Sequence, residues 1–430
     1  MKNWSVVILV LIFWNFSCSP LSKRSLDKTF KSTDERFKDH TGFALYDLDK
    51  KKSVYEYRSG RYFTPASNTK IFTLFSCLTL LGDSIPALKY ITTKDSLIFW
   101  GTGDPSFLYK EVYDNNRIYS FLGSSTLPLY FSDSNFQTTH WGPGWAWDDY
   151  NDYYSAERSA FPIYGNIMTL QATGRKFSVQ PPFLKNYVKT GPSEQKAKVL
   201  RRLESNDFIF YPNFSKSGFK ADVPFKVSTE LTANLLTDTL NKMVRAVHKP
   251  VPKNALTVYS LPVDSLYRVM MQESDNFIAE QLLLMCSQVI SDTLQPEIAI
   301  HHIKENFLKD LKDEPRWVDG SGLSRYNLFT PRSIVQVWEK IYQLLPRERL
   351  FALLATGGRS GTIKNWYNAN APYIFGKTGS LSNNHSLSGY LITKNGKTLI
   401  FCFMNNNYTT SINEIRRNME NILRTIYEKY

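Results

Sequence analysis

Cysteine and histidine are scarce in this sequence of 430 residues, which has four of the first and six of the second. The cysteines after Cys18 each lie inside an apolar run, which favours buried thiols over a disulfide framework. They are Cys77, Cys286 and Cys402. No two histidines have a spacing that places both on one helix face, because His301 and His302 are adjacent. We therefore expect neither a metal nor another cofactor.

Long runs of one charge, internal repeats and low-complexity linkers are also missing from the sequence. Lys and Arg outnumber Asp and Glu by 52 to 39, but the resulting net charge of +13 is spread along the chain. No nucleic-acid-binding motif accompanies this charge, so we expect no nucleic-acid partner. Apolar residues make up 42% of the chain, as in a packed globular protein. The length indicates two domains, or one large domain with an insertion.

The N-terminus carries an apolar run that is too short to span a membrane comfortably. This run, residues 6–14, follows Lys2 and leads into small residues around Cys18. The pattern predicts a secretory signal over residues 1–18 and an exported, periplasmic protein. Cys18 resembles the acylated cysteine of bacterial lipoproteins, although Asn15 stands where such signals prefer Leu. Membrane attachment through a lipidated Cys18 and release without a lipid both stay open.

Hydrophobic patterns predict an α+β fold. Two strand patterns flank a Lys-rich turn near the N-terminus, and Asn395-Gly396 separates two late β-rich runs. Helical patterns cover residues 64–82, 229–247, 263–272, 277–290, 331–345 and 411–430. We expect the terminal strands to share one antiparallel sheet with helices on both faces. The domain with this sheet would comprise residues 24–95 and 245–430, interrupted by a β-rich domain of residues 96–244.

Ser67 stands three residues before Lys70, where the long apolar helical pattern begins. Residues three apart share one helix face, so the hydroxyl and the amine can meet. Burial would lower the pKa of the lysine and let it act as the base that a serine nucleophile needs. The alternative is a serine that caps the helix beside a solvated lysine. The same spacing recurs elsewhere, but only this copy opens a long apolar helix.

Two further motifs follow along the chain. Ser274-Asp275-Asn276 lies in a break between two helical patterns, where it can relay a proton and hold a substrate amide, or cap the second helix. Lys377-Thr378-Gly379 lies in a late β-rich run, where the lysine and hydroxyl can bind a carboxylate and the glycine permits a close approach. A second copy, Lys189-Thr190-Gly191, has no hairpin after it, and we interpret it as chance.

The order of these three motifs is the order in penicillin-binding proteins and class A β-lactamases. Four longer stretches resemble a single family within this group. They cover residues 101–107, 144–156, 273–283 and 319–331. With them, nearly the whole chain after the signal resembles the D-alanyl-D-alanine carboxypeptidases/endopeptidases of the class C penicillin-binding proteins (penicillin-binding protein 4 type). A large insertion between Ser67 and Ser274 separates this family from β-lactamases.

The resemblance implies a serine transpeptidase/β-lactamase-like domain and a D-Ala-D-Ala carboxypeptidase, with DD-endopeptidase action left open. Its partners would be peptidoglycan stem peptides, with β-lactams as covalent inhibitors. Ser67 would be acylated with Lys70 as base, assisted by Ser274 and Asn276. The substrate-binding residues would be Lys377, Thr378, Gly379 and Ser380. The N–H groups of Ser67 and Ser380 would form the oxyanion hole.

Two more residues match the family less directly. Asp149 stands where the family offers a carboxylate to the free amine of a diamino acid, and its alternative role is a turn residue. Arg325 could meet a carboxylate of the same diamino acid or form a surface ion pair. Two other functions stay open: a peptidoglycan-binding module without catalysis, and a β-lactamase or esterase on the same fold.

Overall fold

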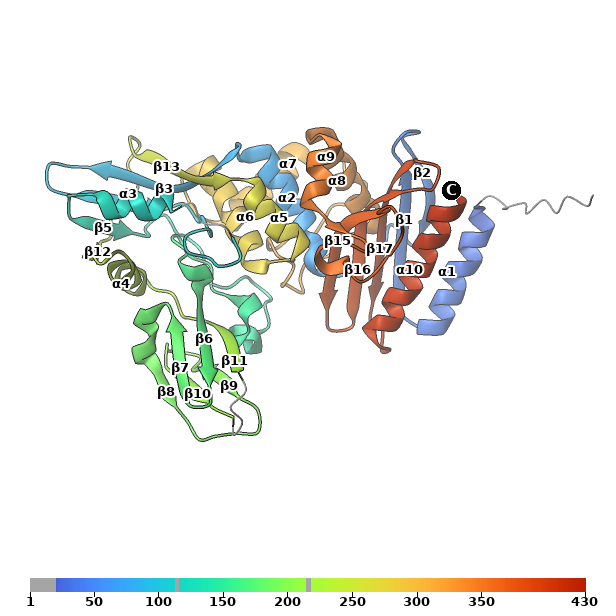
Figure 1. Cartoon of the computed structure of the whole chain (residues 1–430). Helices are drawn as coiled ribbons and strands as arrows, with labels where there is room; N and C mark the ends of the chain where they lie inside the picture. Colours follow the sequence, from blue (N-terminus) through green and yellow to red (C-terminus); the bar gives the residue numbers. More distant parts are fainter. Residues whose placement is uncertain (1–20, 113–115, 214–217) are drawn as a thin grey trace, which may run out of the picture.

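The computed structural model describes residues 21–112, 116–213 and 218–430. The molecule is elongated around a helical centre (Figure 1). A six-stranded sheet lies on one side of this centre, and a five-stranded sheet and a smaller β lobe lie on the other. The predicted signal and Cys18 lie outside the described residues. Among the residues described, no helix is long and apolar enough to cross a membrane.

The six-stranded sheet joins the two ends of the chain. Its antiparallel order is β14 (Ala355–Thr356), β15 (Ile374–Leu381), β16 (Asn384–Ile392), β17 (Thr398–Asn406), β1 (His40–Asp47) and β2 (Lys52–Tyr57). The N-terminal strand β1 pairs with β17 along its full length, from His40 opposite Asn406 to Asp47 opposite Leu399. Gly396 has a φ of 78° in the predicted hairpin turn. The shared antiparallel sheet is therefore confirmed.

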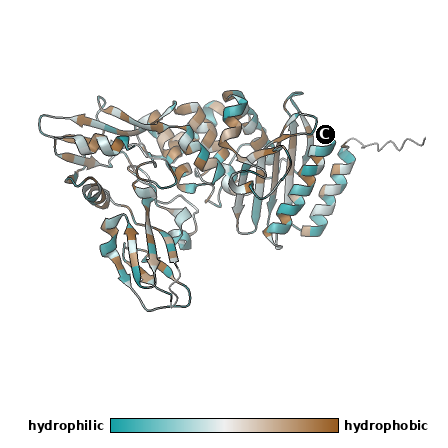
Figure 2. Cartoon of the chain, in the orientation of Figure 1, coloured by the Kyte–Doolittle hydropathy of each residue, from teal (hydrophilic) through white to brown (hydrophobic). Residues whose placement is uncertain are grey.

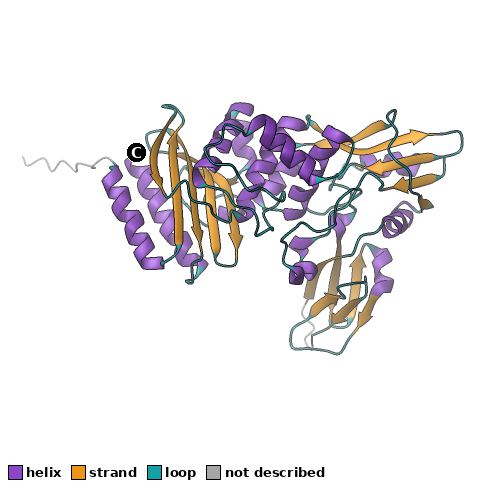
Figure 3. Cartoon of the chain, turned by 180° about the vertical axis from the view of Figure 1, so that it is seen from behind, coloured by secondary structure: helices purple, strands orange, loops and turns teal. Residues whose placement is uncertain are grey.

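Helices cover both faces of this sheet, because successive side chains of each strand enter different cores. Phe43 and Leu45 of β1 pack in one core with Phe30, whereas Ala44 packs in the other. The core with Phe30 is covered by α1 (Lys23–Phe37) and α10 (Ile412–Lys429) (Figure 3). The opposite core is covered by α8 (Pro331–Leu344) and α2 (Lys70–Leu80). Figure 2 shows hydrophilic residues along the outer sides of α1 and α10.

The helical centre contains most of the predicted helices. Besides α2 and α8 it holds α5 (Asp264–Gln272), α6 (Asn276–Ser291), α7 (Pro296–Phe307) and α9 (Arg347–Leu353). The helix predicted over residues 229–247 is shorter, because α4 (Thr229–Leu240) is followed by strand β12 (Val244–Ala246). The predicted helix at 64–82 begins as a 3₁₀ turn over Ala66–Thr69 and continues as α2.

The chain between α2 and α5 builds two β units. The larger is a five-stranded sheet in the order β12, β5 (Leu129–Ser132), β4 (Leu97–Gly101), β3 (Ser84–Thr92) and β13 (Leu256–Pro262), with α3 (Arg117–Ser124) and α4 beside it. The residues of β3 and β13 fall in the segments predicted for the other domain, yet both strands pair within this sheet.

The smaller unit, which we call the small lobe, contains two three-stranded sheets. One is β11 (Gly218–Pro224), β6 (Ile167–Thr173) and β7 (Lys176–Gln180), and the other is β8 (Val188–Thr190), β10 (Phe208–Tyr211) and β9 (Lys198–Arg201). The sheets share a core that includes Leu170 from the first and Phe210 from the second.

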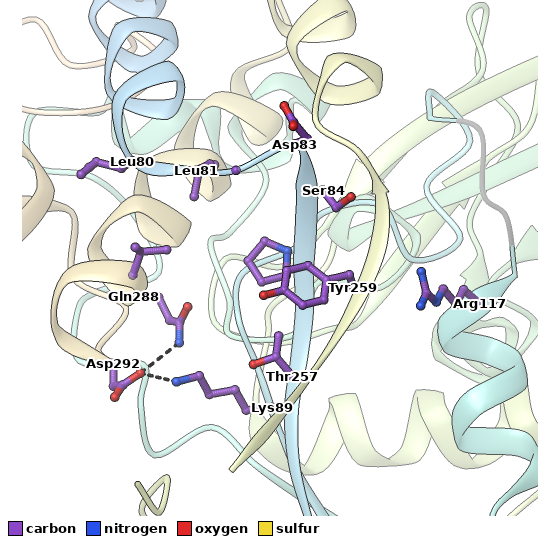
Figure 4. Close-up of a pocket in the computed structure, with 13 residues that line it drawn as sticks. Leu80, Leu81, Asp83, Ser84, Lys89, Arg117, Thr257, Tyr259, Gln288 and Asp292 are labelled. Atoms are coloured by element: carbon purple, nitrogen blue, oxygen red, sulfur yellow. Dashed lines mark hydrogen bonds and ion pairs between the residues drawn. The ribbon is translucent and has the colours of Figure 1, made fainter. Parts of the chain in front are cut away.

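A groove of about 680 Å³ marks the junction between the helical centre and the five-stranded sheet (Figure 4). It lies where the end of α2 meets β3 and β13. Lys89 of β3 forms an ion pair with Asp292, which also accepts a hydrogen bond from Gln288. Lys89 and Asp292 both line the groove, so their charges neutralise each other there.

Candidate active site

Ser67 and Lys70 meet at the start of α2, as their spacing predicts. Lys70 is the first residue of the helix, and its Nζ lies 2.9 Å from the Oγ of half-buried Ser67. Ala66, directly before the serine, has a φ of 48°, a backbone conformation that L-residues rarely adopt. The chain thus makes a tight turn that presents the serine beside the amine.

Lys70 is fully buried, and its amine has three hydrogen-bond partners, all of them oxygen atoms. Besides Ser67, its amine donates to Asn276 Oδ1 at 2.6 Å and to the carbonyl of Ser321 at 2.7 Å. Burial lowers the pKa of this amine to about 8, against the opposing charges of nearby carboxylates, of which Asp319 is the strongest. A neutral amine keeps two hydrogens for Asn276 and Ser321 and directs its lone pair at the Ser67 hydroxyl. This arrangement suits a general base.

Two buried carboxylates hold the Ser321 carbonyl in place, and sequence reasoning missed both. Glu280 accepts the backbone N–H of Ser321 at 2.7 Å, and burial raises the pKa of its carboxyl group. Asp319 accepts the N–H groups of Gly322 and Ser324 at 2.8 and 2.6 Å. Their signal in the sequence is an acidic residue inside an otherwise apolar helix and an Asp opening a glycine-rich loop.

The second motif divides the capping role and the predicted polar contacts between its residues. Asp275 caps α6, since its Oδ1 accepts the N–H of Ile278 at 2.8 Å. Ser274 has a φ of 65°, and its Oγ accepts a hydrogen bond from Lys377 Nζ at 2.7 Å. Asn276 accepts from Lys70 and donates its Nδ2 hydrogen to the carbonyl of Tyr154 at 3.1 Å. Both the cap and the predicted polar pair are therefore present.

The third motif lies on β15, facing the second. Lys377 is fully buried, and burial together with the charge of Lys70 lowers its pKa well below the ordinary value. Its amine also donates to the carbonyl of Thr378 at 2.8 Å, and the Thr378 hydroxyl donates to Thr362 at 2.7 Å. The two lysines and two serines of the motifs thus gather at one place.

Gly379 allows the turn that carries Ser67 to lie directly against β15. A Cβ at this position would be 2.4 Å from the carbonyl oxygen of Pro65 and 2.9 Å from the N of Asn68. Asn68 fixes the same contact from the other side, because its amide bonds the hydroxyls of Ser386 and Ser388 on β16. The close approach expected for Gly379 is therefore confirmed.

If Ser67 is acylated as predicted, we expect Gly379→Ala to slow this step by about 100-fold, since the added methyl must push the turn that carries Ser67 away from β15. Pseudo-first-order labelling with a fluorescent penicillin measures the rate. Gly82→Ala is the matched control, because a Cβ at Gly82 meets no atom within 4 Å. Equal rates for both variants would contradict this role.

Ser380 follows on β15 with an exposed side chain, and its Oγ lies 2.8 Å from Nδ1 of His385. Burial lowers the pKa of His385 to about 3, so its imidazole stays neutral at physiological pH. The histidine therefore supports Ser380 without serving as an acid.

Asp149 and Arg325 lie beside the motifs but outside their hydrogen-bond network. The Tyr154 hydroxyl donates to Asp149 at 3.0 Å, while the carbonyl of the same tyrosine accepts from Asn276. Burial raises the pKa of Asp149, and the guanidinium of exposed Arg325 acts against this. Tyr154 thus links Asp149 to the catalytic motifs. The second Lys-Thr-Gly copy lies at β8 in the small lobe.

Comparisons with known proteins identify the family of the chain. The chain matches the D-Ala-D-Ala carboxypeptidase 3 (S13) family over residues 23–426. It is 22% identical to D-alanyl-D-alanine carboxypeptidase DacB of Haemophilus influenzae, over 86% of each chain.

Solved structures show the same α+β fold. The crystal structure of penicillin binding protein 4 from Haemophilus influenzae has a TM-score of 0.75 and 20% identity, covering 93% of this chain and 99% of that one. A predatory peptidoglycan endopeptidase from Bdellovibrio bacteriovorus has a TM-score of 0.53 and 14% identity, covering 90% and 92%. Because the family match spans most of its length, the chain belongs to the D-Ala-D-Ala carboxypeptidase 3 (S13) family.

Proposed function

We propose that the enzyme hydrolyses the terminal D-Ala-D-Ala bond of peptidoglycan stem peptides through an acyl-enzyme on Ser67. Ser67 Oγ attacks the penultimate D-alanine carbonyl while Lys70 takes its proton. The C–N bond then breaks, the proton passes to the leaving D-alanine amine, and water hydrolyses the ester. The observation that carries this proposal is the buried Lys70 amine, 2.9 Å from Ser67 Oγ and bonded otherwise to two carbonyl-type oxygens.

The other motif residues have supporting roles in this proposal. Ser274, bonded to Lys377, relays the proton toward the leaving amine. Asn276 orients Lys70 and the substrate amide. Lys377 and Thr378 bind the terminal carboxylate, and Gly379 keeps their strand close to Ser67. The N–H groups of Ser67 and Ser380 stabilise the oxyanion.

Release of D-alanine from a soluble pentapeptide tests the proposal, together with labelling by a β-lactam. We expect release and a lasting covalent adduct. Absence of both in a folded protein would indicate a binding module, whereas rapid turnover of the β-lactam would indicate a β-lactamase. A related crystal structure, of the Haemophilus influenzae protein, contains a bound β-lactam, which supports the choice of probe.

We further propose that cross-linked muropeptides are substrates, since a protein of similar fold is named a peptidoglycan endopeptidase. Both reactions need the same acylation step, with a different leaving amine. Product analysis on cross-linked and uncross-linked muropeptides separates the two activities.

Asp149 and Arg325 are proposed to bind the diamino acid of the stem peptide, Asp149 through its amine and Arg325 through its carboxylate. Asp149 accepts a hydrogen bond from the hydroxyl of Tyr154, whose carbonyl accepts one from Asn276.

We expect Asp149→Asn to raise KM for a substrate with a free side-chain amine by about tenfold, because one charged contact is lost. Acylation by a penicillin should be unchanged. The exposed neighbour Asp148, as Asp148→Asn, is the control, and an equal effect of both changes would contradict the assignment.

We also propose the limits of the inserted unit and the cellular location of the protein. The inserted unit runs from Ser84 to Pro262, because β3 and β13 pair with its strands. The signal directs export to the periplasm and is then removed. Mass analysis of the mature N-terminus tests this and tells whether Cys18 carries lipid.

A further inference from the structure

The small lobe carries a large share of the positive charge of the molecule. Residues 167–226 contain eleven Lys and Arg but only four Asp and Glu, in a chain whose net charge is +13. More than half of the net charge therefore belongs to this short segment.

The carboxylates of the small lobe are already engaged. Three of them form ion pairs: Glu194 with Lys198, Glu204 with Lys226, and Asp222 with Lys110. The fourth, Asp207, accepts the hydroxyl of Ser205 at 2.9 Å. Within the described residues they leave exposed lysines of the lobe, among them Lys176 and Lys189, without an acidic partner.

Exposed basic side chains occupy both outward faces of the small lobe. Lys220 and Lys176 lie on the β11-β6-β7 sheet, around a depression of about 730 Å³ that also contains Gln171 and Ser178. Lys189 lies on β8 of the other sheet, with Lys185 before it. Within the described ranges, no ion pair includes any of these four basic residues.

We propose that the small lobe is a docking surface for the carboxylates of the peptidoglycan network. In the proposed function, on which the identity of this partner rests, each uncross-linked stem peptide ends in a carboxylate. The network is therefore a repeating anion, and summed charges attract such a polymer even where single contacts are weak.

The placement of the charges favours a polymer network over a membrane. The two sheets share one core, so their outward faces point in opposite directions. A flat bilayer can touch only one of these faces at a time, whereas strands of a network can lie along both. Figure 1 shows the small lobe projecting away from the sheet that carries β15. Docking there leaves the catalytic motifs free to act on neighbouring stem peptides.

Co-sedimentation with insoluble purified peptidoglycan tests this proposal. The test variant is Lys176→Gln/Lys189→Gln/Lys220→Gln, and the control is Lys28→Gln/Lys31→Gln/Lys429→Gln, which removes the same charge from α1 and α10 at the far end of the molecule. Both are made in the full chain with Ser67→Ala, so that the polymer stays intact. We expect the lobe variant to bind about tenfold more weakly at about 0.05 M NaCl. The control variant should bind like the parent, and high salt should remove the difference.

Equal binding of the lobe and control variants would overturn the proposal. So would binding to vesicles of phosphatidylglycerol without binding to peptidoglycan, which would indicate a membrane partner. The lobe variant with Ser67 restored should release D-alanine from a soluble pentapeptide at the parent rate. Failure of the parent to release D-alanine would count against the proposed function alone, because co-sedimentation does not need catalysis.

Discussion

Replacing Ser67 with alanine should abolish covalent labelling by a β-lactam and lower D-alanine release by about a million-fold, the scale seen when a serine hydrolase loses its nucleophile. The reason is that, among the residues that the structure describes, Ser67 has the hydroxyl that bonds to the Lys70 amine. Asn276 and the carbonyl of Ser321 hold that amine in place. Mass spectrometry of the intact protein after exposure to a penicillin measures the adduct.

Ser193→Ala provides the matched control for this prediction. Ser193 stands three residues before Lys196, the same spacing as Ser67 and Lys70, but lies in the small lobe. Labelling of this variant should equal that of the parent. An adduct that persists in Ser67→Ala, or disappears in Ser193→Ala, would show that the nucleophile lies elsewhere.

Acylation should depend on pH through Lys70. Burial lowers the pKa of its amine to about 8, so the neutral form that accepts the Ser67 proton dominates above this pH. Below about pH 7 the acylation rate should fall by about tenfold for each pH unit, as the protonated fraction approaches one. Stopped-flow labelling with a chromogenic penicillin between pH 5 and 9 gives the profile, with the stability of the protein checked at each pH.

Lys70→Met keeps an unbranched side chain, one atom shorter than lysine, and removes the titrating amine. We expect this variant to label at least about 1,000-fold more slowly, within the range of general-base contributions. The residual labelling rate of this variant should not rise between pH 6 and 8. A flat profile in the parent protein, or the same profile in the variant, would exclude Lys70 as the base.

Local patterns predicted those parts of the fold that are apolar and periodic. The C-terminal helix and the Asn395-Gly396 hairpin are examples, because their signals lie within a few residues. Helix α1 has a weaker signal, because only a few apolar residues mark its buried face, and tertiary contacts such as Phe30 on Phe43 stabilise it. Strand β3 is not evident from the sequence, because a proline such as Pro86 disfavours a strand. In the structure Pro86 lies opposite Tyr259, where the register of β3 and β13 is irregular.

In the site, side-chain motifs could be predicted from the sequence, whereas backbone contacts could not. The three motifs could be predicted because each is defined by residue type and order. The carbonyls of Ser321 and Tyr154 could not, since a backbone oxygen has no identity in the sequence and is placed only by the tertiary fold. Glu280 was missed for a related reason, because its partner Ser321 lies far along the chain.

The Tyr154 carbonyl also makes the orientation of the Asn276 amide depend on the insertion. An Asn276 amide turned end for end would present its hydrogens to the Lys70 amine, and the bond to Tyr154 prevents this. Tyr154 lies in the insertion, between β5 and β6. The Lys70 amine therefore has its correctly oriented acceptor only when the insertion is docked. Hydrolysis thus depends on the insertion as well as on the segments that carry the three motifs.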